Sequence, residues 1–321
     1  MHVRRFATAV EVLTPAKLNL FLEVLEKRPD GYHDIETLIT AIGVFDSLYF
    51  TPRPGSEIRL ECRWCLGSAA SEAGLGGNTN LPRSPIHDEI PDGPQNLVYR
   101  AVELLRTTAQ VASGATVLLI KRVPAAAGLG GGSSDAAAAL VAANIAWKLH
   151  WPLEQLRELA AQIGSDVPFF LTGGAAICRG RGERISEVRS RPLPVVVVRP
   201  PVGLGTAPVY KRCQPAPQPA SVERIQAALA GGQAREVGQL MHNRLQPAAA
   251  TVSEWISVLQ DCFAKENLVG HQMSGSGSSY FGLCHSGRSA RRVAARLRAR
   301  RMGAVFATTT TACHENLDGC H

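Results

Sequence analysis

The sequence predicts an α+β fold, because helical and extended segments are mixed without a strict strand–helix–strand rhythm. Alternating apolar residues near the N-terminus predict long strands, and apolar residues at helical spacing recur through the middle and the C-terminal third. A chain of 321 residues is long enough for one large domain or two moderate ones.

A long β-hairpin is predicted at the start of the chain. Apolar residues alternate over residues 10–25, a second extended run covers 35–50, and the Pro-Asp-Gly sequence at 29–31 between them is typical of a turn. Residues 62–94 lack periodicity and are rich in glycine, proline, serine and asparagine. This composition predicts a long surface insertion.

The central third is predicted to hold both helices and strands. Apolar spacing predicts helices over 96–110, 133–149 and 153–163, and strands over 115–123, 175–178, 185–188 and 193–198. The last of these strands contains four consecutive valines, which is typical of a buried strand.

The C-terminal third is predicted to begin with a short helix near Tyr210 and a proline-rich loop over 215–219. Further helices are predicted over 222–230, 233–241 and 249–263, and strands over 269–273, 280–284 and 304–310. Between the last two strands, residues 288–301 are rich in arginine with Ala290, Val293, Ala294 and Leu297 at helical spacing. This pattern predicts an amphipathic helix with a solvated basic face.

The composition excludes two classes of protein. With 45% hydrophobic and 19% charged residues, the chain is in the globular range, which excludes disorder as its main state. No stretch reaches the roughly 18 uncharged apolar residues of a membrane span, so we expect a soluble, cytoplasmic protein without a membrane partner. The net charge is +7, but the arginine-rich helix lacks aromatic residues for base stacking, and we expect no nucleic-acid partner.

The eight cysteines lack the spacing of a disulfide framework, so we expect reduced thiols. Two clusters contain zinc-type donors. Cys62 and Cys65 form a C-x-x-C without a second such pair, and the C-terminal tail carries Cys313, His314, Cys320 and His321. We expect no metal site at either place.

The strongest local signal is the glycine-rich stretch that joins the predicted strand ending at Pro124 to the helix after it. Glycines let the backbone approach an anion closely, and the free N–H groups and dipole of a helix N-terminus bind phosphate. The stretch lacks the Gly-Lys-Ser/Thr of a Walker A loop and is not G-x-G-x-x-G within a strand–helix–strand unit. Ser133, Ser134 and Asp135 also suit helix capping alone. The predicted ATP-binding residues are Pro124, Ala125, Ala126, Ala127, Gly128, Leu129, Gly130, Gly131, Gly132, Ser133 and Ser134.

This stretch resembles the phosphate loop of the GHMP kinase family, P-x-x-x-G-L-G-x-S-S-x-A, in a variant with three glycines before the serines. Further segments that resemble the family follow in order: 15–20 with 31–33, then 164–170, then 273–278. The match spans 12–311 with gaps at the insertion. The branch it resembles phosphorylates 4-diphosphocytidyl-2-C-methyl-D-erythritol in the non-mevalonate isoprenoid pathway.

The resemblance implies two lobes, residues 1–190 and 191–321, with the active site between them. It also implies two catalytic residues. Asp166 matches the aspartate that orients or deprotonates the acceptor hydroxyl, and Lys17 matches the lysine that stabilises charge. Lys17 is otherwise unexpected at the head of an apolar strand, and the structural alternatives from the sequence alone are a charge at a strand edge for Lys17 and a turn residue for Asp166.

The resemblance also places the substrate. Tyr32 and Tyr210 are candidates to stack on the cytosine, with His33 and Asn19 supplying edge hydrogen bonds. Thr206 and the second glycine loop, Gly275, Ser276 and Gly277, are the other predicted substrate residues. The structural alternatives are a hairpin flank for Tyr32 and His33, a half-buried aromatic for Tyr210, and a simple turn for the glycine loop.

The resemblance has departures. Residues 243–247, Asn-Arg-Leu-Gln-Pro, replace both acids of the family's N-D-L-E-P with Arg244 and Gln246, and we assign these positions no catalytic part. We expect an ATP-dependent phosphotransferase that uses Mg²⁺ with ATP, as a monomer or homodimer. The alternatives are another GHMP kinase, for mevalonate or homoserine, which Tyr32 and His33 disfavour, and a non-enzymatic basic RNA-binding protein.

Overall fold

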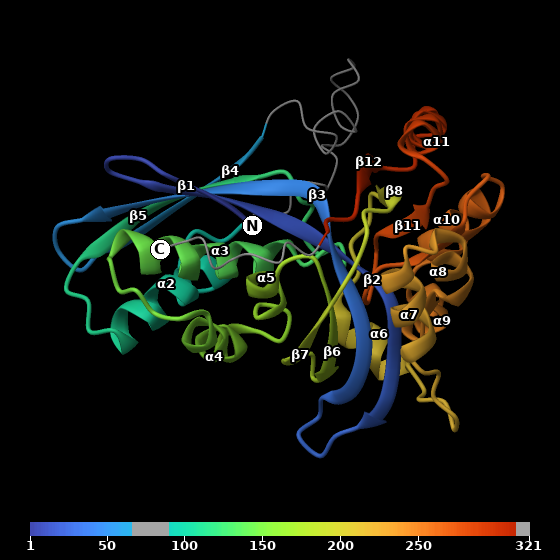
Figure 1. Cartoon of the computed structure of the whole chain (residues 1–321), viewed down its shortest axis with the longest axis horizontal. Helices are drawn as coiled ribbons and strands as arrows, with labels where there is room; N and C mark the ends of the chain where they lie inside the picture. The colour runs from blue at the N-terminus through green and yellow to red at the C-terminus, as the bar shows by residue number, and fades with distance from the viewer. Residues whose placement is uncertain (66–89, 313–321) are drawn as a thin grey trace.

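The computed structural model describes residues 1–65 and 90–312, which form two β-sheets with helices packed against them (Figure 1). The first sheet has the strand order β1-β2-β3-β5-β4, with β6 beside β3, β7 beside β6 and β9 beside β2. Its strands are β1 (His2–Arg5), β2 (Val10–Lys27), β3 (His33–Arg53), β4 (Ile58–Trp64), β5 (Gly114–Lys121), β6 (Ala175–Gly180), β7 (Arg184–Val188) and β9 (His242–Asn243).

The second sheet has the order β10-β11-β8-β12, and all its neighbours are antiparallel. Its strands are β8 (Pro194–Arg199), β10 (Gly270–Met273), β11 (Tyr280–Leu283) and β12 (Ala304–Thr309). The predicted lobe boundary at residue 190 falls in the connection between β7 and β8, and it remains a prediction. An isolated bridge between Ile42 and Thr310 joins the two sheets.

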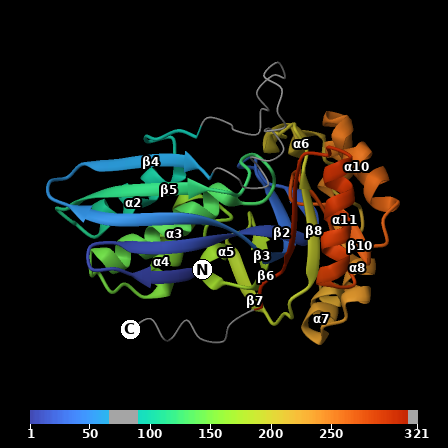
Figure 2. The same ribbon diagram turned by 90° about the horizontal axis from the view of Figure 1, so that it is seen from above.

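Helices cover one face of each sheet, as seen from above in Figure 2. The helices against the first sheet are α2 (Leu97–Thr108), α3 (Gly131–Ala146), α4 (Leu153–Ile163) and α5 (Phe169–Thr172). Those of the C-terminal half are α6 (Thr206–Arg212), α7 (Glu223–Gly231), α8 (Ala234–Leu240), α9 (Leu245–Val252), α10 (Glu254–Ala264) and α11 (Gly287–Ala299). None of the helices in the described part of the chain is long and apolar enough to cross a bilayer.

The long hairpin predicted from the alternating runs is confirmed as β2 and β3, which pair antiparallel from Val10 with Phe50 to Lys27 with His33. Most residues of β2 are buried, because α3 packs against it from the N-terminal half and β9 and α9 pack against it from the C-terminal half. The arginine-rich helix is also confirmed as α11. Its four apolar residues are buried and its arginines are exposed.

Three sequence predictions were wrong in detail. Residues 249–263 form two helices because Ser253 adopts an extended backbone and caps α10 through the amide of Trp255. Strand β4 extends to Trp64, three residues into the predicted insertion, whose residues 66–89 lie outside the described chain. Helix α3 begins at Gly131 instead of Ser133. Strands β1, β4 and β9 and helix α5 were not predicted, and all of them except the seven-residue β4 have four residues or fewer.

Candidate active site

A cavity of about 970 Å³ brings most of the predicted site residues together. Its walls come from both halves of the chain, including Lys17 and Tyr32 from the first and Thr206 and Tyr210 from the second. Leu129 and Ser134 are the predicted residues that do not line it. The Leu129 side chain is buried in the core, and the Ser134 hydroxyl donates to Pro15 O.

The phosphate loop ends at a helix N-terminus that faces this cavity. The first α-helical hydrogen bond of α3 runs from the Ser134 amide to Gly130 O at 2.9 Å, so the amides of residues 131–133 precede the intrahelical ladder. Gly130 is the N-cap in the left-handed conformation, and no side chain caps the helix. The capping interpretation of Ser133, Ser134 and Asp135 is therefore wrong, and the open amides are of the kind that binds an anion.

The two glycine loops lie against each other. A Cβ on Gly128, whose φ is +72°, would lie 2.2 Å from Ser274 O, so no other residue fits there without moving the second loop. Ser274 Oγ donates to Gly128 O at 3.0 Å, and the Ser279 amide donates to Ala127 O at 3.0 Å. These contacts place the Gly275 loop beside the phosphate loop.

Lys17 and Asp166 meet in the middle of the cavity. Lys17 Nζ lies 3.7 Å from Asp166 Oδ2 and donates to Asn19 Oδ1 at 2.6 Å. The lysine side chain is 5% exposed and the aspartate side chain is 38% exposed, so the carboxylate stays accessible to a ligand. Asn19 Nδ2 donates in turn to Thr37 Oγ1 at 2.9 Å, which fixes the orientation of its carboxamide.

Aromatic residues line the end of the cavity near the tip of the β2–β3 hairpin. The His33 and Tyr210 rings are 5.2 Å apart between centroids, and the exposed Tyr32 ring lies 5.2 Å from the Arg181 guanidinium carbon. Burial, with Lys27 nearby, lowers the pKa of His33, and burial raises the pKa of Tyr210. Both groups are therefore neutral near pH 7 and able to hydrogen-bond to an uncharged base.

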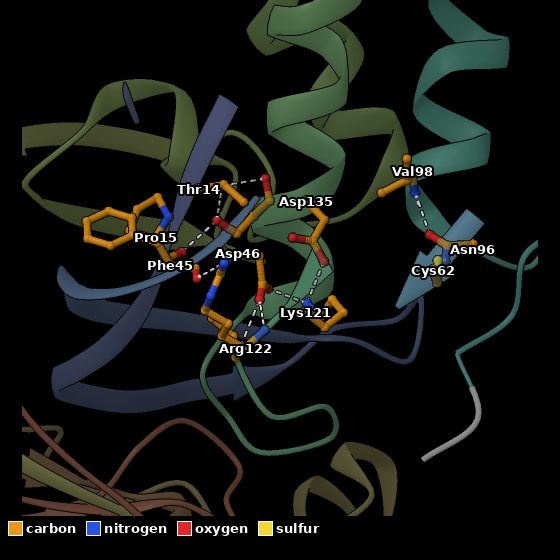
Figure 3. A network of polar contacts seen from close by, with 12 residues as sticks. Thr14, Pro15, Phe45, Asp46, Cys62, Asn96, Val98, Lys121, Arg122 and Asp135 are labelled. Carbon is orange, nitrogen blue, oxygen red and sulfur yellow. Dashed lines mark hydrogen bonds and ion pairs between the residues drawn. The ribbon is translucent and has the colours of Figure 1, made fainter. Parts of the chain in front are cut away.

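Sequence reasoning missed a buried ionic cluster beside the phosphate loop, shown in Figure 3. Lys121, the last residue of β5, donates to Asp46 of β3 and, at 2.6 Å, to Oδ2 of Asp135, the fifth residue of α3. Burial alone would lower the pKa of Lys121, but the two carboxyls raise it, and burial raises the pKa of Asp135 to about 8. The cluster holds the N-terminal part of α3 against the sheet. Its sequence signal was a lysine in an apolar strand, the same signal that identified Lys17.

Other cations reach the cavity wall. Lys27, Arg181 and Lys211 line it, and within the described part of the chain none of the three forms an ion pair with a carboxylate. Thr206 Oγ1 lies 3.0 Å from Ser276 Oγ, so α6 contacts the second glycine loop at the same end. The positive charge of these three side chains would attract an anionic ligand to this part of the cavity.

The described residues contain no group of three or more side chains suited to a resident metal ion. Cys62 and Cys65 belong to no such group, and the Cys/His tail lies outside the described residues.

Comparisons with known proteins agree with this geometry. The GHMP kinases N terminal domain matches residues 96–174, and the GHMP kinases C terminal domain matches 225–302. A 4-diphosphocytidyl-2-C-methyl-D-erythritol kinase of Pelotomaculum thermopropionicum is 40% identical over 292 residues, which cover 90% of this chain and 94% of that protein. Its Bacillus pumilus counterpart is 35% identical, covering 84% and 86%.

Solved structures show the same fold. The crystal structure of a 4-(cytidine 5'-diphospho)-2C-methyl-D-erythritol kinase is 34% identical with a TM-score of 0.74, covering 94% of this chain and 99% of that one. A homoserine kinase from Cytophaga hutchinsonii has a TM-score of 0.69 at 17% identity, covering 97% of each chain, which shows the fold alone. With its two glycine loops and the Lys17–Asp166 pair in one cavity, the chain belongs to the GHMP kinases, in the family of the 4-diphosphocytidyl-2-C-methyl-D-erythritol kinases.

Proposed function

We propose that this protein transfers the γ-phosphoryl group of ATP to the 2-hydroxyl of 4-diphosphocytidyl-2-C-methyl-D-erythritol, in the non-mevalonate route to isoprenoid precursors. One observation carries the proposal. The Lys17–Asp166 pair, 3.7 Å apart, lies in the same cavity as the phosphate loop and the His33–Tyr210 ring pair. GHMP kinases use ATP, and the relatives named for this activity match over most of the chain.

The aromatic end of the cavity fits a cytidine diphosphate. A pyrimidine has a flat face for the Tyr210 and Tyr32 rings, and its edge can hydrogen-bond to the neutral His33 imidazole. The diphosphate would lie near Arg181 and Lys211, two cations of the cavity wall that form no salt bridge with another described residue. This arrangement directs the methylerythritol end of the substrate toward Asp166.

The transfer step needs the acceptor oxygen aligned and the charge on the phosphoryl group balanced. The 2-hydroxyl oxygen bonds to the γ-phosphorus while the bond to the β–γ bridging oxygen breaks, and ADP leaves. Asp166 orients the hydroxyl and accepts its proton, and the ammonium of Lys17 stabilises the charge that develops. The phosphate-loop amides hold the ATP phosphates through the helix N-terminus.

Magnesium fits this site as a companion of ATP. Mg²⁺ usually keeps several waters and binds one or two protein oxygens with the substrate phosphates. The Ser133 hydroxyl and the Asp166 carboxylate are oxygen donors on the cavity wall, while Asp135 is already bonded to Lys121. When bound, the ion neutralises charge on the β- and γ-phosphates.

We further propose that the protein acts in the cytoplasm on small molecules alone, as a monomer or homodimer. Two arginines at the C-terminal end of α11, Arg296 and the C-cap Arg300, pair with the buried carboxylate of Glu266. This pairing and the lack of aromatic residues on the helix argue against an RNA-binding face.

ADP release from purified protein with ATP and Mg²⁺ tests the reaction. The cytidyl substrate is compared with mevalonate and homoserine, in wild type, in Asp166→Asn and in the control Asp261→Asn, an exposed position on α10. We expect turnover with the cytidyl substrate alone, a loss of a thousandfold or more in Asp166→Asn, and unchanged turnover in the control. Wild-type turnover with mevalonate or homoserine, or none with the cytidyl substrate, would refute the assignment.

A further inference from the structure

The segment His242-Asn243-Arg244, here called the 242–244 bracket, joins the strand that carries Lys17 to the second glycine loop. Its first two residues form β9, which runs parallel to β2 with Phe21 opposite His242 and Leu22 opposite Asn243. The Arg244 amide continues the ladder by donating to Leu22 O at 2.8 Å. The bracket thus lies along β2 only a few residues beyond Lys17 and Asn19.

The two outer residues of the bracket bind one buried carboxylate on β2. Glu23 is fully buried and accepts from Arg244 Nε at 2.6 Å and Nη2 at 2.9 Å, with His242 Nε2 at 3.0 Å. The amides of Val24 and Ala220 also donate to it, each at 3.0 Å. Burial of Glu23 opposes its ionisation, but Arg244 and these amides lower its pKa below the ordinary value. Arg244, which departs from the family's motif, therefore has a partner that fixes the bracket to β2.

The middle residue of the bracket, Asn243, binds the second glycine loop. Asn243 is buried, and its carboxamide nitrogen donates to Met273 O at 2.8 Å and to Gly275 O at 2.9 Å. Its oxygen accepts from the Leu245 amide at 2.9 Å. All three contacts are with backbone, and together they use both donors and an acceptor of the carboxamide.

The loop that Asn243 holds lies directly over the reacting groups. A Cβ on Gly275 would be 3.2 Å from Lys17 Nζ and 3.3 Å from Asn19 Oδ1. Asn243 itself does not line the cavity, so it cannot touch a bound ligand. A small shift of this loop would change the space around the Lys17 ammonium, where the phosphoryl group is transferred.

We propose that Asn243 is a positioning residue for phosphoryl transfer: it sets the distance between the Gly275 loop and Lys17, and the Glu23–Arg244 ion pair fixes it to the strand that carries Lys17. The proposal rests on the proposed function for the reaction that it affects. Asparagine is required because the site needs two donors facing two carbonyls and one acceptor facing an amide. Ionised aspartate has no donor, so Asn243→Asp places an oxygen against both carbonyl oxygens at nearly unchanged volume.

The test compares Asn243→Asp with wild type and with Asn144→Asp. Asn144 is a matched control, because its carboxamide also hydrogen-bonds to backbone groups but does not line the cavity. It donates to Trp151 O at 3.1 Å and accepts from the Trp151 amide at 3.0 Å. Steady-state kinetics give kcat, calorimetry with a non-hydrolysable ATP analogue gives Kd and the fraction of binding-competent protein, and hydrogen exchange reports on residues 273–279.

In Asn243→Asp we expect kcat per competent site to fall 10- to 100-fold, while Kd for the ATP analogue changes less than threefold, because the open amides of residues 131–133 belong to α3, which Asn243 does not contact. Exchange of the 273–279 amides should accelerate at least tenfold. Asn144→Asp should change none of these. The positioning role would be wrong if Asn243→Asp kept wild-type loop exchange and its kcat per competent site stayed within twofold. It would also be wrong if Asn243→Asp and Asn144→Asp lost kcat and thermal stability to the same extent. If wild type did not turn over the cytidyl substrate, the proposed function would fail, and the exchange comparison alone would decide the role of Asn243.

Discussion

Replacing Lys121 with methionine tests how the buried cluster beside the phosphate loop is held together. The ammonium is the shared donor to Asp46 and Asp135, and the three side chains are 4%, 0% and 3% exposed. Methionine keeps most of the volume of lysine but removes the charge. Asp46 would keep its bonds from the backbone amides of Arg122 and Val123 and lose its only ion-pair partner in the described chain.

The magnitude follows from what the carboxyls must then do. In wild type, burial raises the pKa of Asp135 to about 8, so one proton together with Lys121 balances the charge of two carboxyls. Without the lysine, the two carboxyls must together hold a second proton. Keeping a carboxyl of unfolded pKa about 3.9 protonated at pH 7 costs about 4 kcal/mol, and at pH 5 about 1.5 kcal/mol. The first value agrees with the roughly 3–5 kcal/mol lost when one partner of a buried ion pair is removed.

The sign of the pH dependence is set by proton uptake. An acid whose folded pKa is raised makes the folded state hold a proton that the unfolded state has lost, so stability falls as the pH rises between the two pKa values. Wild type holds one such proton, on Asp135, and Lys121→Met would hold two. The difference in unfolding free energy between the proteins should therefore grow by about 1.4 kcal/mol per pH unit between pH 5 and 7.

Urea unfolding followed by tryptophan fluorescence at pH 5, 6 and 7 measures this difference. Lys265→Met is the control, because Lys265 is exposed at the end of α10 and should give less than about 0.5 kcal/mol at every pH. A loss in Lys121→Met that was the same at pH 5 and 7, or smaller than about 1 kcal/mol at pH 7, would refute the argument that charge balance holds this cluster.

Two further substitutions test the two ends of the cavity. Gly128→Ala combines a left-handed backbone with a Cβ 2.2 Å from Ser274 O, so we expect a loss of at least about 2 kcal/mol and a melting temperature lower by roughly 5 °C, measured by calorimetry. Gly132→Ala, whose Cβ would meet its nearest neighbour at 3.8 Å, should melt like wild type, and equal melting of both variants would contradict the close approach of the loops. Tyr210→Ala removes the ring beside His33 and should raise KM for the cytidyl substrate about tenfold or more with KM for ATP unchanged, while Tyr210→Phe stays near wild type. A rise in both KM values would show that the ring does not act on the base.

Features with a local signal were predictable from the sequence. The hairpin of β2 and β3 follows from alternation, α4 was predicted with the bounds that it has, and the phosphate loop was identified by glycines between a strand and a helix. Lys17 stood out as a lysine at the head of an apolar strand, and the resemblance to the GHMP kinases assigned it a catalytic role. In each case neighbouring residues carry the information, so no knowledge of the tertiary structure was required.

Features that depend on partners far apart in the sequence were not predictable. Asp135 was interpreted as a possible helix cap because serine, asparagine and aspartate are common there, yet its carboxyl group accepts from Lys121 at the end of β5. β9 has two residues, too few to show any periodicity, and it forms by pairing with β2. Three of the four missed elements are thus short ones whose stability comes from the partner they pack against, and β4 is the exception.

Arg244 shows why a motif departure cannot be judged by the motif alone. The sequence indicated only that an acid of the family pattern had been replaced by a base, which removed a reason to assign the segment a role. In the folded chain, that base lies opposite Glu23, more than two hundred positions earlier, and the pair is bonded at 2.6 Å. Because the substitution leaves the buried carboxylate with a partner, it preserves the attachment of the neighbouring Asn243 to β2. What the position requires is that the 242–244 bracket stays fixed to the strand that carries Lys17, and in this chain the Glu23–Arg244 ion pair meets that requirement.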